Sequence, residues 1–156
     1  MNKKTLKLIV LGCEVVLAVV AFIMMFLPAV EGKLLGSTYN SFQTAFGYTE
    51  SNTSLKVLEF SFGNFLTFIF LLVAIGACCV KVLFKKSNIG KLAGVVSAVL
   101  FIIAGIFFFL TLVFAVFYGG SNVKDLYKLA VGPILAGIFS ILAGCVVCFD
   151  TFFLKD

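Results

Sequence analysis

One carboxylate stands inside a continuous apolar stretch near the start of the chain. Glu14 lies six positions after Leu8, and its helical neighbours on one side include the small residues Ala18 and Ala21. An acidic residue at the centre of a membrane-spanning helix costs about 2.5–3.5 kcal/mol, and less toward the helix ends. We therefore expect Glu14 to face protein rather than lipid, and to be neutral, paired or hydrated there.

Lys81 is the predicted partner of Glu14. It precedes Lys85 by four residues near the end of the second apolar stretch. In an antiparallel helix its amine can therefore reach a depth comparable with that of Glu14. Asp150, near the end of the last apolar stretch, competes for the same lysine. The favoured interpretation is a structural intramembrane polar pair or a snorkelled carboxylate.

A proton or ion relay through Glu14 and Lys81 is the alternative interpretation. Such a relay needs a trail of polar groups across the membrane. The outer half of the predicted bundle offers only weak groups such as Asn64, Thr67 and Thr111. The structural pair is therefore preferred.

Five cysteines offer a second kind of chemistry, and all lie toward the same end of three different apolar stretches. They are Cys13, Cys78, Cys79, Cys145 and Cys148. Cys145 and Cys148 have the i, i+3 spacing that puts two sulfurs on one helical face, which would suit a thiolate metal or redox centre. Cysteine is also a common small apolar residue of buried helices, and an unassisted thiol there is unreactive. We favour the packing role and expect no metal and no cofactor.

The residue types that are absent narrow the chemistry further. The chain has no His, and all twelve of its positive charges are Lys. It therefore lacks an imidazole base, a His metal ligand and the planar guanidinium that clamps phosphate or carboxylate. We predict no catalytic residue and no enzymatic activity.

Composition identifies the elements that must position these groups. Of 156 residues, 62% are hydrophobic and only 12% are charged, which excludes a water-soluble globular domain. Four apolar stretches reach the length of about 20 helical residues that crosses a hydrocarbon core. They are Leu8–Leu27, Phe65–Phe84, Leu92–Phe117 and Leu129–Phe149. The third is overlong and should tilt or project beyond the membrane.

The predicted fold class is all-α: a four-helix transmembrane bundle forming a single domain over residues 1–156, with a long first extracellular loop over residues 28–64. Within that loop, Ser41 followed by Phe42, Phe46 and Gly47 indicates a short capped helix ended by glycine. An irregular or hairpin-like segment is the alternative.

Lysine placement predicts the orientation of this bundle. Seven lysines precede the first stretch or surround the link between the second and third: Lys3, Lys4, Lys7, Lys81, Lys85, Lys86 and Lys91. The other two connections balance lysines against acids: Lys33, Lys56, Lys124 and Lys128 against Glu31, Glu50, Glu59 and Asp125. The positive-inside rule then predicts a multi-pass protein of the plasma membrane with both termini cytoplasmic. An uncleaved N-terminal anchor is favoured over a cleaved signal peptide, because the first stretch is long and contains Glu14.

Small residues mark where the helices can approach closely. The last stretch repeats Gly132, Ala136, Ser140 and Gly144 every four residues, and the third contains Gly94 and Ala98 at the same spacing. Such ridges are a helix-contact signal. We favour packing within one bundle, and homodimerisation through one ridge is the alternative.

The layout resembles that of the claudin-like tetraspan proteins, with both ends inside, a long first outer loop and a short basic inner link. The chain lacks the Trp-based motif and the outer cysteine pair of that family, so the resemblance implies topology alone. The stretch Tyr39-Asn40-Ser41-Phe42-Gln43, the later Phe46-Gly47 and the Lys-only basic set are more similar to those of small uncharacterised four-span proteins of Gram-positive-type bacteria. This resemblance implies that the plasma membrane is a bacterial cytoplasmic membrane.

These features predict a non-enzymatic integral membrane protein that acts as an accessory, scaffold or partner-binding subunit. A small transporter or proton-coupled channel centred on Glu14 and Lys81 is the alternative, and a thiol redox or metal protein is the third. The expected partners are membrane lipids, with another membrane protein or a second copy of the chain still open. The basic charge follows membrane topology, so nucleic acid is not expected.

Overall fold

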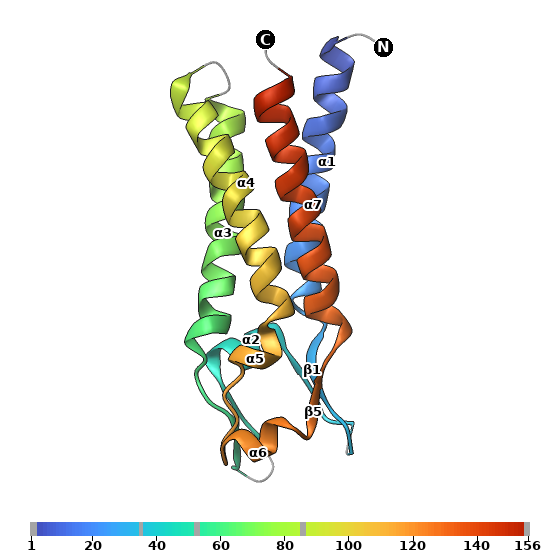
Figure 1. Cartoon of the computed structure of the whole chain (residues 1–156), viewed down its shortest axis with the longest axis vertical. Coiled ribbons are helices and arrows are strands. Elements are labelled where there is room, and N and C mark those ends of the chain that lie inside the picture. Colours follow the sequence, from blue (N-terminus) through green and yellow to red (C-terminus); the bar gives the residue numbers. More distant parts are fainter. Residues whose placement is uncertain (1–2, 35, 52–53, 85–86, 155–156) are drawn as a thin grey trace.

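The computed structural model describes residues 3–34, 36–51, 54–84 and 87–154. Four long helices run side by side, with both chain termini at one end, here called the terminal end (Figure 1). They are α1 (Lys3–Met24), α3 (Phe62–Leu83), α4 (Asn88–Phe109) and α7 (Val131–Phe153). Each is long and apolar enough to cross a membrane. The prediction of a mostly helical chain with four such helices is therefore confirmed.

The end opposite the termini carries a folded cap, made of residues 28–61 and 110–130, which the all-α prediction missed. Its main sheet has the antiparallel order β2-β1-β5, from Thr38–Asn40, Pro28–Gly32 and Tyr127–Leu129. A second pair joins β3 (Tyr48–Thr49) to β4 (Lys56–Leu58). The short helices α2 (Ser41–Phe46), α5 (Thr111–Phe114) and α6 (Ser121–Lys124) complete the cap. The cap encloses a small apolar core that includes Val30, Leu58 and Phe117. Strand pairing provides hydrogen-bond partners for the backbone N–H and C=O groups around this core.

Small residues explain how closely the helices pack. Neighbouring helices pair in the order α1, α7, α4 and α3, whereas α1 and α3 approach each other far less closely. A Cβ on Gly144 would lie 2.9 Å from the carbonyl oxygen of Ala98, and one on Gly105 would lie 2.9 Å from that of Gly137. The hydroxyl of Ser140 donates to the carbonyl oxygen of Phe101 at 2.7 Å. The ridge on α7 is therefore used within the chain.

The predicted ridge residues do not all contact the same element. Ala136 is fully buried in the main core. A Cβ on Gly132, by contrast, would lie 2.6 Å from the carbonyl oxygen of Pro28, so this glycine brings α7 against the start of β1. The ridge thus packs on a helix for most of its length and on the cap at one end.

The third helix is shorter than its apolar run. The prediction of one helix over Leu92–Phe117 is wrong, since α4 ends at Phe109 and the four-residue α5 follows. Thr111 marks the break because its hydroxyl donates back to the carbonyl oxygen of Phe108 at 2.7 Å. The chain then leaves the helical path so that Phe117 can form a bridge with Leu58 in the cap. Apolar composition alone gives no signal for this turn.

The predicted short helix in the first loop is confirmed as α2, but its cap lies one residue earlier than expected. Asn40, not Ser41, accepts a hydrogen bond from the Gln43 backbone N–H at 3.0 Å, and the Gln43 side chain accepts one from the Asn40 N–H at 2.9 Å. This reciprocal pair is a capping box. Gly47 ends the helix with φ of 90°, a conformation that favours glycine.

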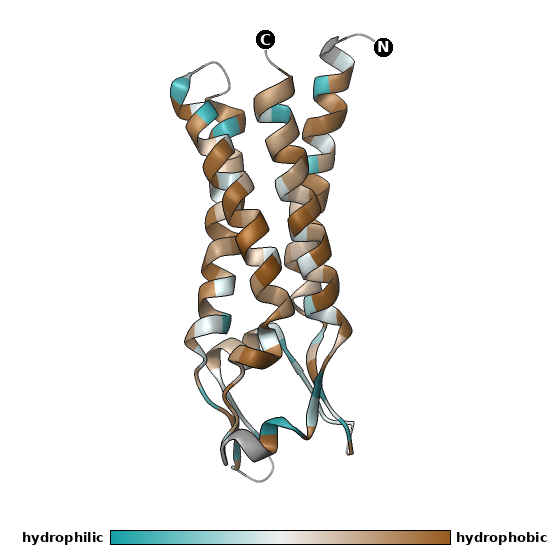
Figure 2. Cartoon of the chain, viewed as in Figure 1, coloured by the Kyte–Doolittle hydropathy of each residue, from teal (hydrophilic) through white to brown (hydrophobic). Residues whose placement is uncertain are grey.

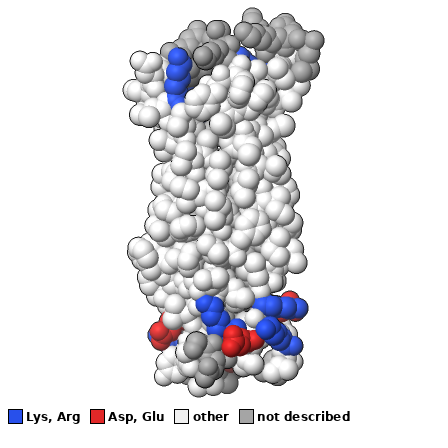
Figure 3. Space-filling model, viewed as in Figure 1, with Lys and Arg blue, Asp and Glu red and all other residues white. Residues whose placement is uncertain are grey.

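A broad apolar surface separates two polar ends. In Figure 2 the long helices are mostly hydrophobic between the terminal end and the cap. In Figure 3 the charged side chains on the displayed face gather at the two ends, and the surface between them is uncharged. Large apolar side chains are exposed there on every long helix, including Val16, Val73, Val99 and Leu142.

Candidate functional site

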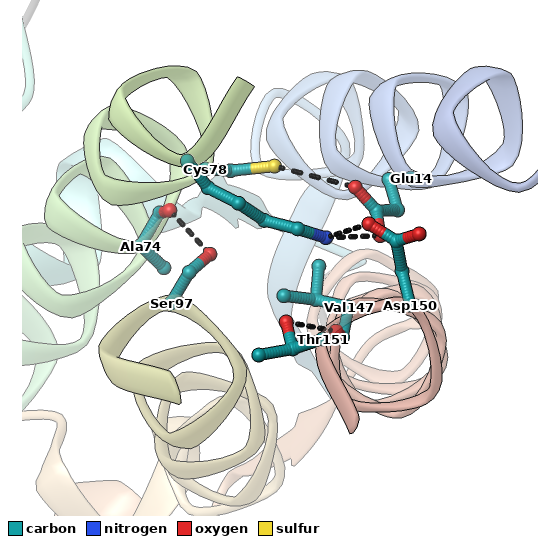
Figure 4. Close-up of polar contacts among 8 residues, drawn as sticks. Glu14, Ala74, Cys78, Ser97, Val147, Asp150 and Thr151 are labelled. Atoms are coloured by element: carbon teal, nitrogen blue, oxygen red, sulfur yellow. Dashed lines mark hydrogen bonds and ion pairs between the residues drawn. The ribbon is translucent and has the colours of Figure 1, made fainter. Parts of the chain in front are cut away.

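Three charged side chains from three different helices meet near the terminal end. Glu14 comes from α1 and Asp150 from α7 (Figure 4). Lys81 comes from α3. The Lys81 Nζ donates to the Glu14 Oε1 at 2.7 Å and lies 2.6 Å from the Asp150 Oδ2. The structure thus brings all three sequence-predicted residues together, and Lys81 contacts both acids at once. We call this group the ion triad.

The ion triad is enclosed by protein. The exposed fraction is 0% for Glu14, 6% for Lys81 and 8% for Asp150. The helices α1 and α3 approach each other less closely than the other neighbouring helices. The long Lys81 side chain spans the interior between them. Lys81 therefore joins α3 to both α1 and α7 through charge.

Gly94 of α4 makes room for this arrangement. A Cβ on Gly94 would lie 3.3 Å from the Lys81 Cδ and only 2.5 Å from the Thr151 Oγ1. The sequence indicates Gly94 only as part of a packing ridge. In the structure it also leaves space beside the lysine side chain, on the fourth helix of the bundle.

Cys78 is a member of the site that the sequence analysis considered only among the five cysteines, and not as a neighbour of Glu14. Its buried thiol lies 3.9 Å from the Glu14 Oε2, one helical turn before Lys81 on the same face of α3. The i, i+3 spacing from Lys81 is the signal that could have found it. Ser97 of α4 lies beside this thiol and donates to the Ala74 carbonyl oxygen at 2.8 Å. The polar cluster therefore extends from the ion triad to α4.

The cost of burying charges makes the three members of the ion triad depend on one another for stability. Burying charges is costly, and their mutual attraction offsets this cost only when the geometry is good. Removing one partner of a buried pair typically costs about 3–5 kcal/mol, because the other charge is left in a low dielectric. Two carboxylates share the Lys81 ammonium. Replacing Lys81 therefore affects two buried acids, whereas replacing either acid leaves Lys81 with the other one.

Two hydroxyls farther along the long helices donate to backbone carbonyl oxygens, one within its own helix and one on a neighbouring helix. The Thr67 hydroxyl donates to the carbonyl oxygen of Gly63 at 2.9 Å, one turn earlier on α3. Ser140 likewise donates to a backbone carbonyl on α4. These are the arrangements expected of packing hydroxyls in apolar helices.

The remaining cysteines are dispersed. All five are free: Cys13, Cys79 and Cys145 are exposed, Cys148 is half-buried, and Cys78 alone is buried. Within the described ranges, no group of three or more His, Cys, Asp or Glu side chains is arranged to hold a metal ion. The structure therefore does not gather the Cys145–Cys148 pair into a larger ligand set.

The basic residues of the terminal end are only partly described. Lys91 is exposed at the start of α4, and Lys7 is half-buried on α1. The side chains of Lys3, Lys4, Lys85 and Lys86 lie outside the described residues. In the cap, Lys128 pairs with Glu31 at 3.4 Å, and Lys56 pairs with Glu59 at 3.3 Å.

Comparisons of the chain with protein-family models, with curated proteins and with solved structures find no match. Function is therefore inferred from the arrangement of the chain's own residues.

Proposed function

We propose that this chain is a non-enzymatic, four-span protein of the plasma membrane, with both termini cytoplasmic, that serves as an accessory, scaffold or partner-binding subunit. The four long helices and the uncharged surface around them support membrane insertion. The excess of lysines at the terminal end, against the balanced charges of the cap, supports the orientation.

The observation that carries the structural role is the mutual pairing of the ion triad. Lys81 holds Glu14 and Asp150 within 2.7 Å, and all three side chains are buried. A group paired in this way fixes three helices at the terminal end, while the cap joins the same helices at the other end. The result is a rigid frame that presents the strands of the cap outside the membrane.

The cap is the proposed surface for a protein partner. It exposes several large apolar side chains among balanced charges: Leu34, Leu55, Tyr118 and Leu126. Exposed apolar side chains rimmed by polar groups are typical of interaction surfaces. The opposite charges of the rim pair with one another in Lys128–Glu31 and Lys56–Glu59, so recognition would rest on the apolar side chains.

Topology is tested by labelling with a membrane-impermeant maleimide. A cysteine is introduced at Ser87 or, separately, at Leu55, in a background in which the five native cysteines are replaced. We expect labelling at Leu55 in intact cells, and labelling at Ser87 only after the membrane is opened. Labelling of Ser87→Cys from outside intact cells would overturn the orientation.

Partner binding is tested by photocrosslinking in native membranes. A photoreactive residue at Leu55 or Tyr118 should give a discrete protein adduct, whereas one at Val73, exposed near the middle of α3, should react with lipid. Failure of every cap position to give a protein adduct would contradict the partner-binding role.

Proton-coupled transport is the second candidate, and the sharing of one ammonium by two carboxylates favours it, because buried ionisable groups mark ion pathways in many transporters. The test is ion or proton flux in vesicles that contain the purified protein. Flux that is abolished by Glu14→Gln, in a variant that remains folded, would establish transport. The structural role predicts no flux above that of empty vesicles.

A further inference from the structure

A layer of apolar side chains surrounds the junction between the long helices and the strands of the cap. In Figure 1, α2 and α5 lie directly against the helix ends, on the bundle side of the strands. The layer exposes Phe46 of α2 (51%), Phe60 (54%), Phe62 at the start of α3 (68%) and Val113 of α5 (61%). We call these four residues the collar. Phe46 and Phe60 both contact the ring of Phe65, with centroids 5.7 and 5.5 Å apart, so the two exposed rings are held by one helix.

Two polar side chains of this same layer, Asn64 and Ser61, are directed inward. Asn64 is 5% exposed, and its amide nitrogen donates to the carbonyl oxygens of Thr44 at 3.3 Å and Thr111 at 3.2 Å. Ser61, fully buried, donates to the carbonyl oxygen of Phe114 at 2.7 Å. Asn64 therefore joins α2, α3 and α5 from the inside, while the collar covers them outside.

This inside-out arrangement indicates what surrounds the collar. In water, the free energy of folding favours apolar side chains inside and polar ones at the surface. In a lipid environment, apolar side chains can face outward at no cost, and polar groups must be satisfied within the protein. The collar layer follows the second pattern in the direction of its side chains, apolar outward and polar inward, although the buried Asn64 Oδ1 and Ser41 Oγ have no hydrogen-bond partner among the described residues. The layer is continuous with the apolar surface of the long helices.

The length of the helices places the membrane boundary at this layer. The whole of α3, from Phe62 to Leu83, is about 32 Å long at the standard rise per residue. The α4 segment from Lys91 to Phe109 is about 27 Å long. A hydrocarbon core is about 30 Å thick. A core that begins at the lysines of the terminal end therefore reaches to the collar or slightly beyond it.

We infer that the collar is a lipid-contact surface that inserts into the outer leaflet, at the boundary between acyl chains and headgroups, so that α2 and α5 belong to the membrane-embedded part of the protein. The partner is the phospholipid bilayer itself. The inference rests on the proposed insertion of the four helices in a bilayer. It adds that the base of the cap, which includes α2 and α5, lies within the membrane, and that the strands, α6 and the described turns beside them project beyond it.

The absence of Trp from the chain gives a direct test, because one introduced Trp is then the only indole in the protein. Phe46→Trp, Phe60→Trp and Phe62→Trp variants are each reconstituted into phosphatidylcholine vesicles. The lipids carry bromine either near the headgroup end or near the methyl end of the acyl chains, and bromine quenches Trp emission on contact. We expect most of the emission to be lost with the shallow bromine and less with the deep bromine.

Two matched controls separate this inference from the proposed function. Val73→Trp, near the middle of α3, should be quenched by the deep bromine, and Tyr118→Trp, exposed in the cap, should be quenched by neither lipid but by aqueous iodide. If the Trp at Val73 escapes quenching, membrane insertion itself is wrong. If it is quenched while Trp at Phe46, Phe60 and Phe62 responds only to iodide, the collar lies in water and the inference is overturned. Three collar positions keep the test decisive if one variant does not fold.

Discussion

At the terminal end of the bundle, Lys81 joins α1, α3 and α7 through two ionic contacts of 2.7 and 2.6 Å. At the opposite end, Asn64 joins α2, α3 and α5 through two neutral hydrogen bonds of 3.3 and 3.2 Å. Both groups are buried and each connects three elements. They differ in what remains when a partner is removed: a buried charge at the first site and a buried neutral carbonyl at the second.

That difference predicts that a change at the terminal end lowers the free energy of unfolding more than a change at the cap end. An uncompensated buried charge costs several kcal/mol, whereas a neutral hydrogen bond contributes about 0.5–1.5 kcal/mol net. The cap end also has strand pairing and continuous loops to hold its elements together. The terminal end has no described sheet, and the chain passes directly between helices there only from α3 to α4, so α1 and α7 depend on side-chain contacts with the other helices.

The largest effect is expected from Lys81→Met. This change keeps most of the side-chain volume but leaves Glu14 and Asp150 buried without their ammonium. We expect the free energy of unfolding to fall by about 3–5 kcal/mol, measured by denaturant titration in mixed micelles. The control is Lys91→Met, which removes an exposed lysine from the start of α4 and should change stability by no more than about 0.5 kcal/mol. Equal losses of stability in Lys81→Met and Lys91→Met would contradict a special contribution of the ion triad to the terminal end.

The second-largest loss of stability is expected from overpacking beside the ion triad. The methyl group of Gly94→Ala would lie 2.5 Å from the Thr151 Oγ1. Either the Thr151 side chain must rotate out of its hydrogen bond to the Val147 carbonyl oxygen, or α4 and α7 must separate. We expect destabilisation of about 1–3 kcal/mol by the same titration. Gly76→Ala on α3 is the matched control, because its methyl group would meet nothing within 4 Å. The comparison fails if Gly94→Ala is tolerated as well as Gly76→Ala.

At the cap end, Asn64→Leu should have a smaller effect. It removes the donor to Thr44 and Thr111 and leaves their carbonyl oxygens buried. We expect a loss of about 1–2 kcal/mol, with the ion triad intact. A loss as large as that of Lys81→Met would show that the neutral junction contributes as much as the charged one.

The smallest effect is an alkaline sensitivity confined to the cap. Burial raises the pKa of Tyr39, and the nearby Tyr127 adds to the shift through charge repulsion and a side-chain hydrogen bond. The folded state therefore holds this proton more tightly than the unfolded state, and its contribution to stability is lost as the pH rises through the tyrosine range above about 10. Tyr39→Phe should weaken the decline in cap stability at high pH, followed by hydrogen exchange. An unchanged alkaline profile would contradict this assignment.

The two ends also differ in how well the sequence predicts them. Glu14, Lys81 and Asp150 are among the few charged residues in the long apolar stretches. Burying any one of them without a partner is costly, and this restricts which residues can lie beside them. Helix length then brings them to similar depth. The favoured packing role of the small residues on α7 follows from similarly local information.

The cap depends on contacts that local patterns do not contain. Val30 pairs with Leu129, and Leu58 forms a bridge with Phe117, so both loops must be folded before either strand has a partner. The break after Phe109 likewise depends on Thr111, which stands in an uninterrupted apolar run. Cys78 was recognised as a small apolar residue, and its contact with Glu14 depends on the register between α1 and α3.

The ion triad as a closed structural unit is tested most directly by replacing all three of its charges at once. The free energy of unfolding of Glu14→Met/Lys81→Met/Asp150→Leu is measured beside that of Lys81→Met in the same micelles. If the three charges serve chiefly to satisfy one another, the triple variant recovers most of the loss of about 3–5 kcal/mol caused by Lys81→Met. A triple variant less stable than Lys81→Met would contradict this account, because each charge would then stabilise the fold independently.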